Sequence, residues 1–407
     1  MPSRYLPRAL EPILRRAAGE FPAVILTGPR QSGKTTLLKH VFGSQAGYVS
    51  LEPPDVRAAA AADPRGFLAM NPAPLIVDEV QHAPGLLPYI KERIDEQRGT
   101  AGQYLLTGSQ NLLLTEQVTE SLAGRAAMLR LLPFSRREEF GRPRDPLPWE
   151  ARKRIPKARR STRADLWKGL LRGGYPELVT NSKRDLSLWH SSYVQTYLER
   201  DVRSLRQVGD LLSFQSFLRV LAARSGQLLN LTDVARDLGV AVNTAKAWLS
   251  ILEATYQVLV LRPYHANTGK RLVKTPKVYF TDTGTLCYLT GLKDADHAAA
   301  GPLGGAIFET AVLLEVLKVF VNRGEEPRLY FWRTSAGAEV DIVVDTGERL
   351  VPIEVKLSAT PRPGMSVGIQ AFQAAYGERA AEGFVVHSGE VRLPLAPRVL
   401  AVPFEPF

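Results

Sequence analysis

The chain has 407 residues, of which 45% are hydrophobic and 23% are charged, and this composition excludes a disordered, fibrous or collagen-like protein. Its length predicts roughly two or three domains, and its net charge of +11 favours polyanionic partners such as nucleic acid or an anionic membrane surface. The single cysteine, Cys287, excludes an intrachain disulfide. We expect a soluble, cytoplasmic protein without membrane insertion, because no apolar run approaches the ~18 residues of a membrane span.

Apolar runs separated by helical periods predict an α/β sheet near the start of the chain. A short helix is predicted over residues 9–18, and the run at 23–28 has the composition of a buried parallel strand. Further strands are predicted at 75–79 and 103–110, with a helix at 86–96 between them.

A phosphate-binding loop is predicted at residues 28–35, which match G-x-x-x-x-G-K-[ST] between a predicted strand and a predicted helix. In such a loop the backbone N–H groups bind phosphate oxygens. Lys34 would place a cation on the β- and γ-phosphates, and the Thr35 hydroxyl would bind Mg²⁺. We therefore expect ATP and Mg²⁺ as ligands, with nucleotide binding by Gly28, Pro29, Arg30, Gln31, Ser32, Gly33, Lys34, Thr35 and Thr36.

An acidic motif argues against a chance match in a glycine-rich loop. The apolar run at 75–77 leads into Asp78 and Glu79 at the end of a predicted buried strand, where two carboxylates are costly unless they are used. Asp78 suits the outer shell of Mg²⁺, and Glu79 suits the base that polarises the attacking water. The two motifs together predict ATP binding and hydrolysis.

Two further polar residues are candidates for catalysis. Ser109 ends the third predicted strand, where its hydroxyl suits contact with the γ-phosphate or orientation of water; a hydrogen-bonded turn is the alternative. Arg125 suits an arginine finger that reaches the nucleotide of a neighbouring subunit in a homo-oligomer. The alternative for Arg125 is a solvated arginine.

Residues 141–163 are rich in proline and arginine and have no apolar period, which predicts a long exposed loop. Seven Lys or Arg and no acidic residue lie within 151–163, so most of the +11 belongs to this stretch and +4 remains for the rest of the chain. A basic segment of this kind favours salt-sensitive contact with a polyanion near the ATPase. It does not by itself support DNA recognition further along the chain.

A helical region is predicted at 164–225, followed at 226–297 by a helix-turn-helix pattern and two strands. The second helix of such a motif often enters the DNA major groove, and plain interdomain packing is the alternative. Its exposed face is predicted to carry Asn243, Thr244, Lys246 and Trp248. The strands carry basic residues that suit phosphate contacts or a solvated face: Arg262, Lys270, Arg271, Lys274 and Lys277.

The last unit, 298–407, is predicted as helix, three strands, helix and strand. Glu309 lies on the apolar face of the first helix, opposite Glu315 and Lys318, and an acid there needs a partner or a metal. Asp341 lies on one predicted strand. The next predicted strand carries Glu354 and Lys356, which are two positions apart and therefore lie on one face of the strand.

These motifs resemble a known group, the AAA+-type ATPases widespread in bacteria and archaea, whose members carry a C-terminal domain of unknown function. The resemblance covers nearly the whole chain through GPRQSGKTT, LIVDEVQ, LLTGSQ, SLAGR, LPFSRREE, RGGYPE and YVQTYLERDV. It implies an α/β protein with an AAA+ P-loop core at 1–140, a basic loop at 141–163, a helical lid at 164–225, a winged helix at 226–297 and a restriction-endonuclease-like domain at 298–407.

The C-terminal acids and lysine resemble the PD-(D/E)xK nucleases. The resemblance implies that Asp341 and Glu354 hold Mg²⁺, that Glu309 completes the metal shell, and that Lys356 orients water or stabilises the phosphorane charge. Two alternatives stay open: a structural cluster in which Lys356 pairs with Asp341 or Glu354, and an inherited site that has lost activity.

We therefore expect an ATPase that couples nucleotide turnover to a winged-helix and nuclease-like module acting on DNA. A non-nucleolytic signalling or scaffold ATPase is the alternative, with C-terminal units that bind protein. Salt-dependent DNA affinity would separate the two hypotheses.

Overall fold

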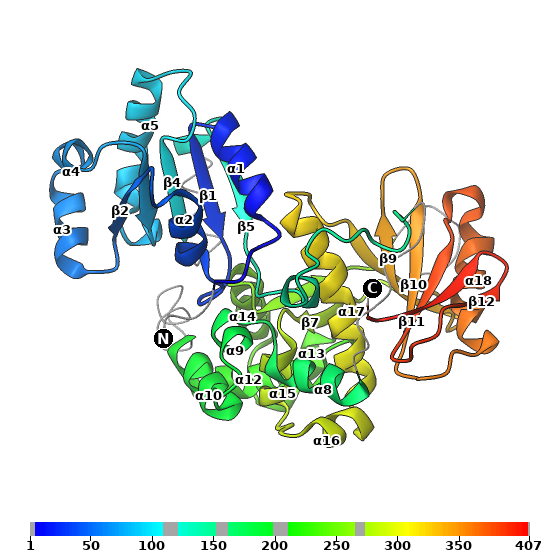
Figure 1. Ribbon diagram of the computed structural model, residues 1–407. Coiled ribbons are helices and arrows are strands. Elements are labelled where there is room, and N and C mark those ends of the chain that lie inside the picture. The colour runs from blue at the N-terminus through cyan, green and yellow to red at the C-terminus, as the bar shows by residue number, and fades with distance from the viewer. Residues whose placement is uncertain (1–4, 109–120, 152–161, 198–210, 265–272, 406–407) are drawn as a thin grey trace.

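The structure is a computed structural model that describes residues 5–108, 121–151, 162–197, 211–264 and 273–405. Figure 1 shows a sheet domain formed by the first third of the chain, a group of helices in the middle, and a second sheet formed by the end of the chain. The long helix α17 (Gly304–Asn322) lies between the group of helices and the second sheet.

The N-terminal sheet is entirely parallel and has the strand order β2-β3-β4-β1-β5. Three strands were predicted: β1 (Ala23–Thr27), β3 (Leu75–Asp78) and β4 (Tyr104–Gly108). The two strands at the edges were missed, and most of their residues are partly or fully exposed: β2 (Gly47–Ser50) and β5 (Ala126–Arg130). β4 lies between β1 and β3, so the P-loop strand and the acidic strand both border β4.

Helices cover both faces of this sheet because the side chains of β1 alternate between two apolar clusters. Val24 and Leu26 pack against α1 (Glu11–Glu20) and α2 (Lys34–Phe42). Ala23 and Ile25 belong to the other cluster, which includes residues of several elements: α3 (Pro54–Ala62), α4 (Pro64–Met70), the short helices η1 (Val80–His82) and η2 (Pro84–Leu86), and α5 (Leu87–Glu96).

The middle of the chain is helical as predicted. Its helices α13 (Leu231–Leu238) and α14 (Val242–Ala254), called the helix pair below, are followed by a two-stranded antiparallel sheet of β6 (Val258–Leu261) and β7 (Lys277–Phe280). Trp248 was predicted to be exposed, but it is buried with its ring centroid 5.4 Å from those of Phe214 and Phe217. The helices are α7 (Arg136–Glu139), α8 (Arg163–Arg172), α9 (Pro176–Thr180), α10 (Leu186–Tyr197), α12 (Leu211–Ala223), α13 (Leu231–Leu238), α14 (Val242–Ala254), α15 (Thr283–Leu289) and α16 (Ala295–Ala300).

The C-terminal sheet has six strands in the order β12-β13-β11-β10-β9-β8. The prediction of one strand after the last helix was incomplete, since β12 and β13 follow β11. The elements after α17 are β8 (Leu329–Arg333), β9 (Glu339–Asp345), β10 (Leu350–Lys356), η4 (Pro363–Ser366), α18 (Val367–Tyr376), η5 (Gly377–Arg379), β11 (Gly383–His387), β12 (Leu393–Ala396) and β13 (Val399–Pro403).

The middle and C-terminal parts share one apolar core, which extends along the chain from Leu132 to Phe404. α17 is central to this core, and its predicted polar face is also buried. Glu315 accepts a hydrogen bond from the Arg136 backbone, and Lys318 donates one to the Phe134 carbonyl oxygen. A smaller separate cluster, which includes Trp332 and Phe372, lies almost wholly within the C-terminal part, so the expected division into helical and C-terminal units stays a prediction.

The predicted exposed loop at 141–163 was wrong for part of its length. Leu147 is fully buried, Trp149 packs against the shared core, and Glu150 forms an ion pair with Arg323 at 2.6 Å. The absence of an apolar period concealed these single anchoring side chains. Ten residues of the segment, 152–161, lie outside the described residues.

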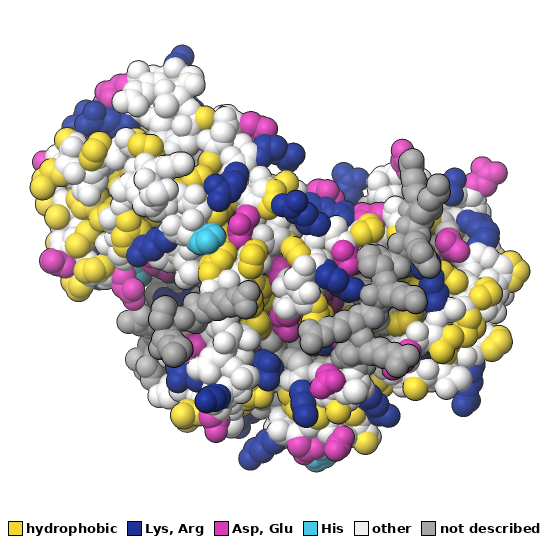
Figure 2. All heavy atoms as spheres, viewed as in Figure 1, with side chains coloured by type: hydrophobic (Ala, Val, Ile, Leu, Met, Phe, Trp, Pro, Cys, Tyr) yellow, Lys and Arg dark blue, Asp and Glu magenta, His cyan; other side chains and the backbone are white. Residues whose placement is uncertain are grey.

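Charged side chains of both signs are interspersed over the face of the molecule drawn in Figure 2. This mixing agrees with the small net charge that remains once the basic stretch at 151–163 is set aside. None of the described helices combines the length and the apolar composition that crossing a bilayer requires.

Candidate functional site

The predicted P-loop connects β1 to α2 and folds around the side chain of Lys34. The Lys34 ammonium donates hydrogen bonds to the carbonyl oxygens of Gly28 (3.0 Å) and Pro29 (2.9 Å). Gly28 has a φ of +145° and lies against the Leu131 carbonyl, so a Cβ at this position would collide with backbone. The buried Ser32 hydroxyl has no hydrogen-bond partner among the residues that the structure describes, which leaves it available to a ligand.

The end of β3 places a buried carboxylate, Asp78, beside the first turn of α2. Three hydroxyl groups donate to this carboxylate: Thr35 at 2.8 Å, Thr107 at 2.5 Å and Tyr48 at 3.0 Å. Thr107 reaches Asp78 because β4 is the neighbour of β3 in the sheet. A threonine hydroxyl facing a carboxylate supplies the hard oxygen ligands that Mg²⁺ prefers, so the residues present fit this ion.

Glu79 follows Asp78 in a left-handed backbone conformation with φ of +55°. Non-glycine residues rarely adopt this conformation, and it occurs preferentially at functional sites. The Glu79 backbone N–H donates to Thr107 Oγ1 at 3.0 Å, and the Gln81 side-chain amide donates to the Glu79 carboxylate. The carboxylate is thus oriented by its neighbours at the edge of the P-loop.

The P-loop opens into a cavity of about 610 Å³, a size within the usual range for small-molecule sites. Its lining includes Gln31, Gly33, Lys34, Thr35, Thr36 and Glu79 from the predicted site. Other lining residues were not predicted, among them Tyr5, Arg8, Phe134, Pro176 and Asn181. The RGGYPE segment was the available signal for Pro176, whose Cγ would lie 3.5 Å from a Cβ on Gly33.

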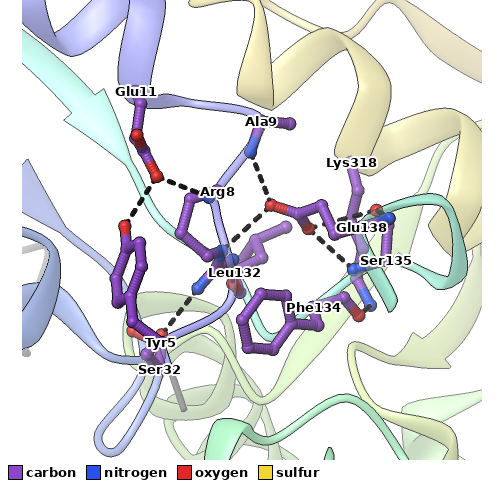
Figure 3. Close-up of polar contacts among 10 residues, drawn as sticks. All are labelled: Tyr5, Arg8, Ala9, Glu11, Ser32, Leu132, Phe134, Ser135, Glu138 and Lys318. Carbon is purple, nitrogen blue, oxygen red and sulfur yellow. Dashed lines mark hydrogen bonds and ion pairs between the residues drawn. The ribbon is translucent and has the colours of Figure 1, made fainter. Parts of the chain in front are cut away.

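Arg8 connects the P-loop to the segment that follows the N-terminal sheet. Its guanidinium donates to the Ser32 carbonyl (2.9 Å), to the Leu132 carbonyl (2.6 Å) and to Glu138 (2.9 Å), and it lies 4.1 Å above the Phe134 ring. Figure 3 shows this side chain between the P-loop and α7. The sequence held no signal for the Arg8 side chain, because the hydrogen-bond partners of its guanidinium are at least 24 residues away.

The Glu138 carboxylate is fully enclosed but remains the partner of Arg8. Burial by itself raises the pKa of Glu138, yet the Arg8 charge and hydrogen bonds from the Ser135 and Ala9 N–H groups outweigh burial and lower the pKa. Glu138 is also part of a capping box with Ser135 at the start of α7. The residue after Ser135, Arg136, contacts Glu315 of α17 through its backbone N–H.

A second connection joins the P-loop strand to the helix pair. The Tyr256 hydroxyl donates to Thr27 Oγ1 at 2.9 Å, and Thr27 is the last residue of β1. Tyr256 lies just after α14, has a φ of +60°, and its ring is 5.3 Å from the Arg130 guanidinium at the end of β5. The end of the sheet that carries the P-loop thus contacts the helix pair directly.

Of the two remaining catalytic candidates, Arg125 and Ser109, the structure describes only Arg125. Arg125 pairs with Asp95 through two hydrogen bonds of 2.8 and 3.0 Å. Arg125 directly precedes β5, and the first residue of β5 lies beside the first residue of β1. The P-loop follows the last residue of β1, at the opposite end of the strands. Arg125 therefore does not reach the P-loop of its own chain, and contact with a neighbouring subunit stays a prediction. Ser109 lies outside the described residues.

A separate cleft of about 680 Å³ lies on the C-terminal sheet and gathers the four predicted nuclease-like residues. Glu309 comes from α17, Asp341 from β9, and Glu354 and Lys356 from β10. Lys356 Nζ is 2.5 Å from Glu354 Oε1, as expected for residues on one face of a strand. Burial, with the neighbouring Asp341 carboxylate, raises the pKa of Glu309 to about 7 and that of Glu354 to about 8.

The expectation that Lys277 contacts phosphates was wrong, because its ammonium is buried in this cleft. It lies 2.8 Å from Glu339 and 3.3 Å from Glu309, and its side chain is only 4% exposed. Sequence reasoning also missed Glu339 and Tyr279, whose hydroxyl donates to Glu309 at 2.5 Å. These residues come from three separate elements, so no local pattern joins them.

Family models match three consecutive stretches of the chain. A model described as AAA domain matches residues 20–140. Models described as domain of unknown function match residues 163–296 (DUF8612) and 304–407 (DUF4143). Two curated relatives are each 34% identical over 393 residues, covering 96% of this chain and 82% of the relative: uncharacterized protein Mb2031c of Mycobacterium bovis and uncharacterized protein Rv2008c of Mycobacterium tuberculosis.

Similar solved structures include the Walker-type ATPase PABY2304 of Pyrococcus abyssi, with 15% identity, a TM-score of 0.44, and coverage of 69% of this chain and 94% of that chain. A single-residue variant of Thermotoga maritima RuvB has 17% identity and a TM-score of 0.26, with coverage of 62% and 85%. Neither superposition is close, so the assignment of the chain depends on the sequence matches.

Proposed function

Because this chain belongs to the family of the two mycobacterial proteins and carries an AAA-type P-loop ATPase domain, we propose that it hydrolyses ATP with Mg²⁺ and passes the nucleotide state to its C-terminal part. The observation that carries the proposal is the cavity at the P-loop, whose lining includes Lys34, Thr35 and Glu79 together with Arg8 and Pro176.

Each residue of the cavity has a role in this proposal. Lys34 leaves its loop carbonyls to bind phosphate oxygens, and the backbone N–H groups at the start of α2 bind the same phosphates. Thr35 and Asp78 would hold Mg²⁺, which neutralises the charge that develops on the phosphates when it is bound. Glu79 orients the attacking water and accepts its proton.

Two contacts support transmission from the nucleotide to the rest of the molecule. Arg8 donates to the P-loop at Ser32 and also to Glu138, whose helix contacts α17. Tyr256 holds the last residue of β1, directly before Gly28. If phosphate binding moves the P-loop, the hydrogen bonds of Arg8 and Tyr256 must move with it or break. Packed interfaces shift between discrete arrangements rather than deform continuously, so such a movement would reach the rest of the molecule.

The test measures ATP binding and Mg²⁺-dependent phosphate release in the same preparations. Lys34→Ala should lose ATP binding, whereas Glu79→Gln should bind ATP normally and hydrolyse it about 10²-fold or more slowly. Lys293→Ala is the control, because Lys293 is exposed and remote from the cavity. Hydrolysis by Glu79→Gln at the rate of the unaltered protein would remove Glu79 from the mechanism.

DNA is the partner that we propose for the C-terminal part, on the ground that the four nuclease-like residues meet in one cleft. The ATPase assay is therefore repeated with single- and double-stranded DNA at several salt concentrations. Stimulation that weakens as salt rises supports DNA as the partner. Unchanged turnover together with no DNA binding at low salt would exclude it.

A further inference from the structure

The C-terminal cleft contains a cation that belongs to the protein. Lys277 Nζ lies 2.8 Å from Glu339 Oε1, 3.3 Å from Glu309 Oε1 and 3.9 Å from Asp341 Oδ1. The side chain of Lys277 is only 4% exposed, so water does not screen these contacts. One ammonium group thus forms ion pairs with three carboxylates, one from α17 and two from β9.

Lys277 is delivered to this position by a rigid part of the fold outside the six-stranded sheet. It is the first residue of β7 and pairs with Leu261 of β6, and its backbone also forms a bridge with Leu228. The adjacent Gly226 N–H donates to the Val278 carbonyl. The backbone of Lys277 is therefore fixed by pairing on both sides, and this fixes the point from which its side chain enters the cleft.

Two further polar groups of the cleft have partners, whereas Glu354 Oε2 is buried without a hydrogen-bond partner among the described residues. Lys356 Nζ pairs with Glu354 Oε1 at 2.5 Å, and Asp341 Oδ2 accepts the Val355 N–H at 2.8 Å. Within the described part of the chain, no three Asp, Glu, His or Cys side chains are placed to hold a metal ion. A Mg²⁺ ion needs several oxygen ligands at about 2.0–2.1 Å, so the Mg²⁺ that a nuclease site implies does not fit this arrangement.

We infer that Lys277 is the resident cation of the cleft and that its ammonium excludes divalent ions from Glu309, Glu339 and Asp341. The inference does not depend on ATP hydrolysis, because it concerns a different part of the molecule. Buried carboxylates without a counter-charge are unstable, so removal of the ammonium leaves a site that a divalent cation can compensate. The acids that line the cleft are therefore a metal site only in the absence of Lys277.

The experiment titrates Mn²⁺ into nucleotide-free protein and counts bound ions by electron paramagnetic resonance. The unaltered protein should show no site that depends on Asp341. Lys277→Met should gain one Mn²⁺ site, bound about tenfold or more tightly than any site of the unaltered protein, and Mn²⁺ should raise its unfolding midpoint by about 2–4 °C. Adding Asp341→Asn to Lys277→Met should abolish the gain.

Lys274→Met is the matched control, because Lys274 is an exposed lysine three residues away. It should bind Mn²⁺ as the unaltered protein does. A folded Lys277→Met protein that gains no Mn²⁺ site would overturn the inference. If Lys277→Met does not fold, Mn²⁺ binding is compared between the unaltered protein and the single variant Asp341→Asn. Equal binding supports the exclusion of divalent ions by Lys277, and loss of a Mn²⁺ site in Asp341→Asn refutes it.

Discussion

The ion pair of Arg8 and Glu138 shows how two buried charges are made tolerable. Each charge has additional partners, since Arg8 also donates to two carbonyl oxygens and Glu138 accepts backbone N–H groups. A buried ion pair offsets its desolvation only when such further hydrogen bonds exist. Because one end of the network is the P-loop, this pair contributes both to folding and to the nucleotide site.

Glu138→Gln should destabilise the protein at pH 7 by about 3–5 kcal/mol, because it leaves Arg8 buried without its counter-charge. The pKa of Glu138 is lowered in the folded state, so its ionised form stabilises the fold at neutral pH, and this contribution is lost as the pH falls below 4.5 through the folded pKa. The difference between variant and unaltered protein should therefore shrink in acid. Denaturant unfolding from pH 7 to pH 3 measures it.

Glu378→Gln is the control for this pH series, since Glu378 is exposed. It should unfold like the unaltered protein at every pH. A loss of stability in Glu138→Gln that is equal at pH 7 and pH 3 would contradict the assigned linkage.

At the scale of elements, β1 contacts the helix pair through Tyr256, which lies just after α14. Tyr256 donates to Thr27 at the end of β1, and Thr27 also donates to the Leu129 carbonyl of β5. β1 was predicted because its residues are continuously apolar, and the P-loop was predicted because its chemistry is local. The contact between Thr27 and Tyr256 spans 229 residues and no local pattern indicates it.

Tyr256→Phe removes this hydrogen bond and keeps the ring in place. The loss should cost about 1 kcal/mol of stability and leave ATP binding nearly unchanged. Hydrogen exchange with and without a non-hydrolysable ATP analogue measures the transmission. The ATP-dependent protection of α14 and β6 should be weaker in Tyr256→Phe than in the control Tyr330→Phe, and equal protection in both would show that the signal takes another route.

At the scale of the whole molecule, we expect the middle and C-terminal parts to unfold together, because they share one apolar core. Phe308 of α17 is fully buried and lies 5.3 Å from the Phe404 ring, at the far end of the chain. α17 contacts both α15 and β10, so one side chain influences the helices and the second sheet. The N-terminal sheet has its own two clusters and is expected to respond separately.

Phe308→Ala should lower the stability of the shared core by about 3–5 kcal/mol. Hydrogen exchange should then increase together in α8, α15 and β10, while β1 and β4 keep their protection. Val391→Ala is the control, because Val391 is 53% exposed. Faster exchange confined to the C-terminal sheet would indicate two independent units, as the sequence alone had suggested.

The sequence by itself determined the chemistry of the nucleotide site, because the P-loop and the acids after β3 are short motifs whose function depends on adjacent residues. It also indicated that Glu309, Asp341, Glu354 and Lys356 belong together. Only the tertiary structure decided that Lys277 pairs with Glu309 and Asp341, that Arg8 contacts the P-loop, and that the helical and C-terminal parts share one core. The physical reason is that burial and charge pairing depend on which surfaces meet. A periodic apolar pattern predicts that one face of a helix or strand is buried, but it does not identify the element that packs against that face.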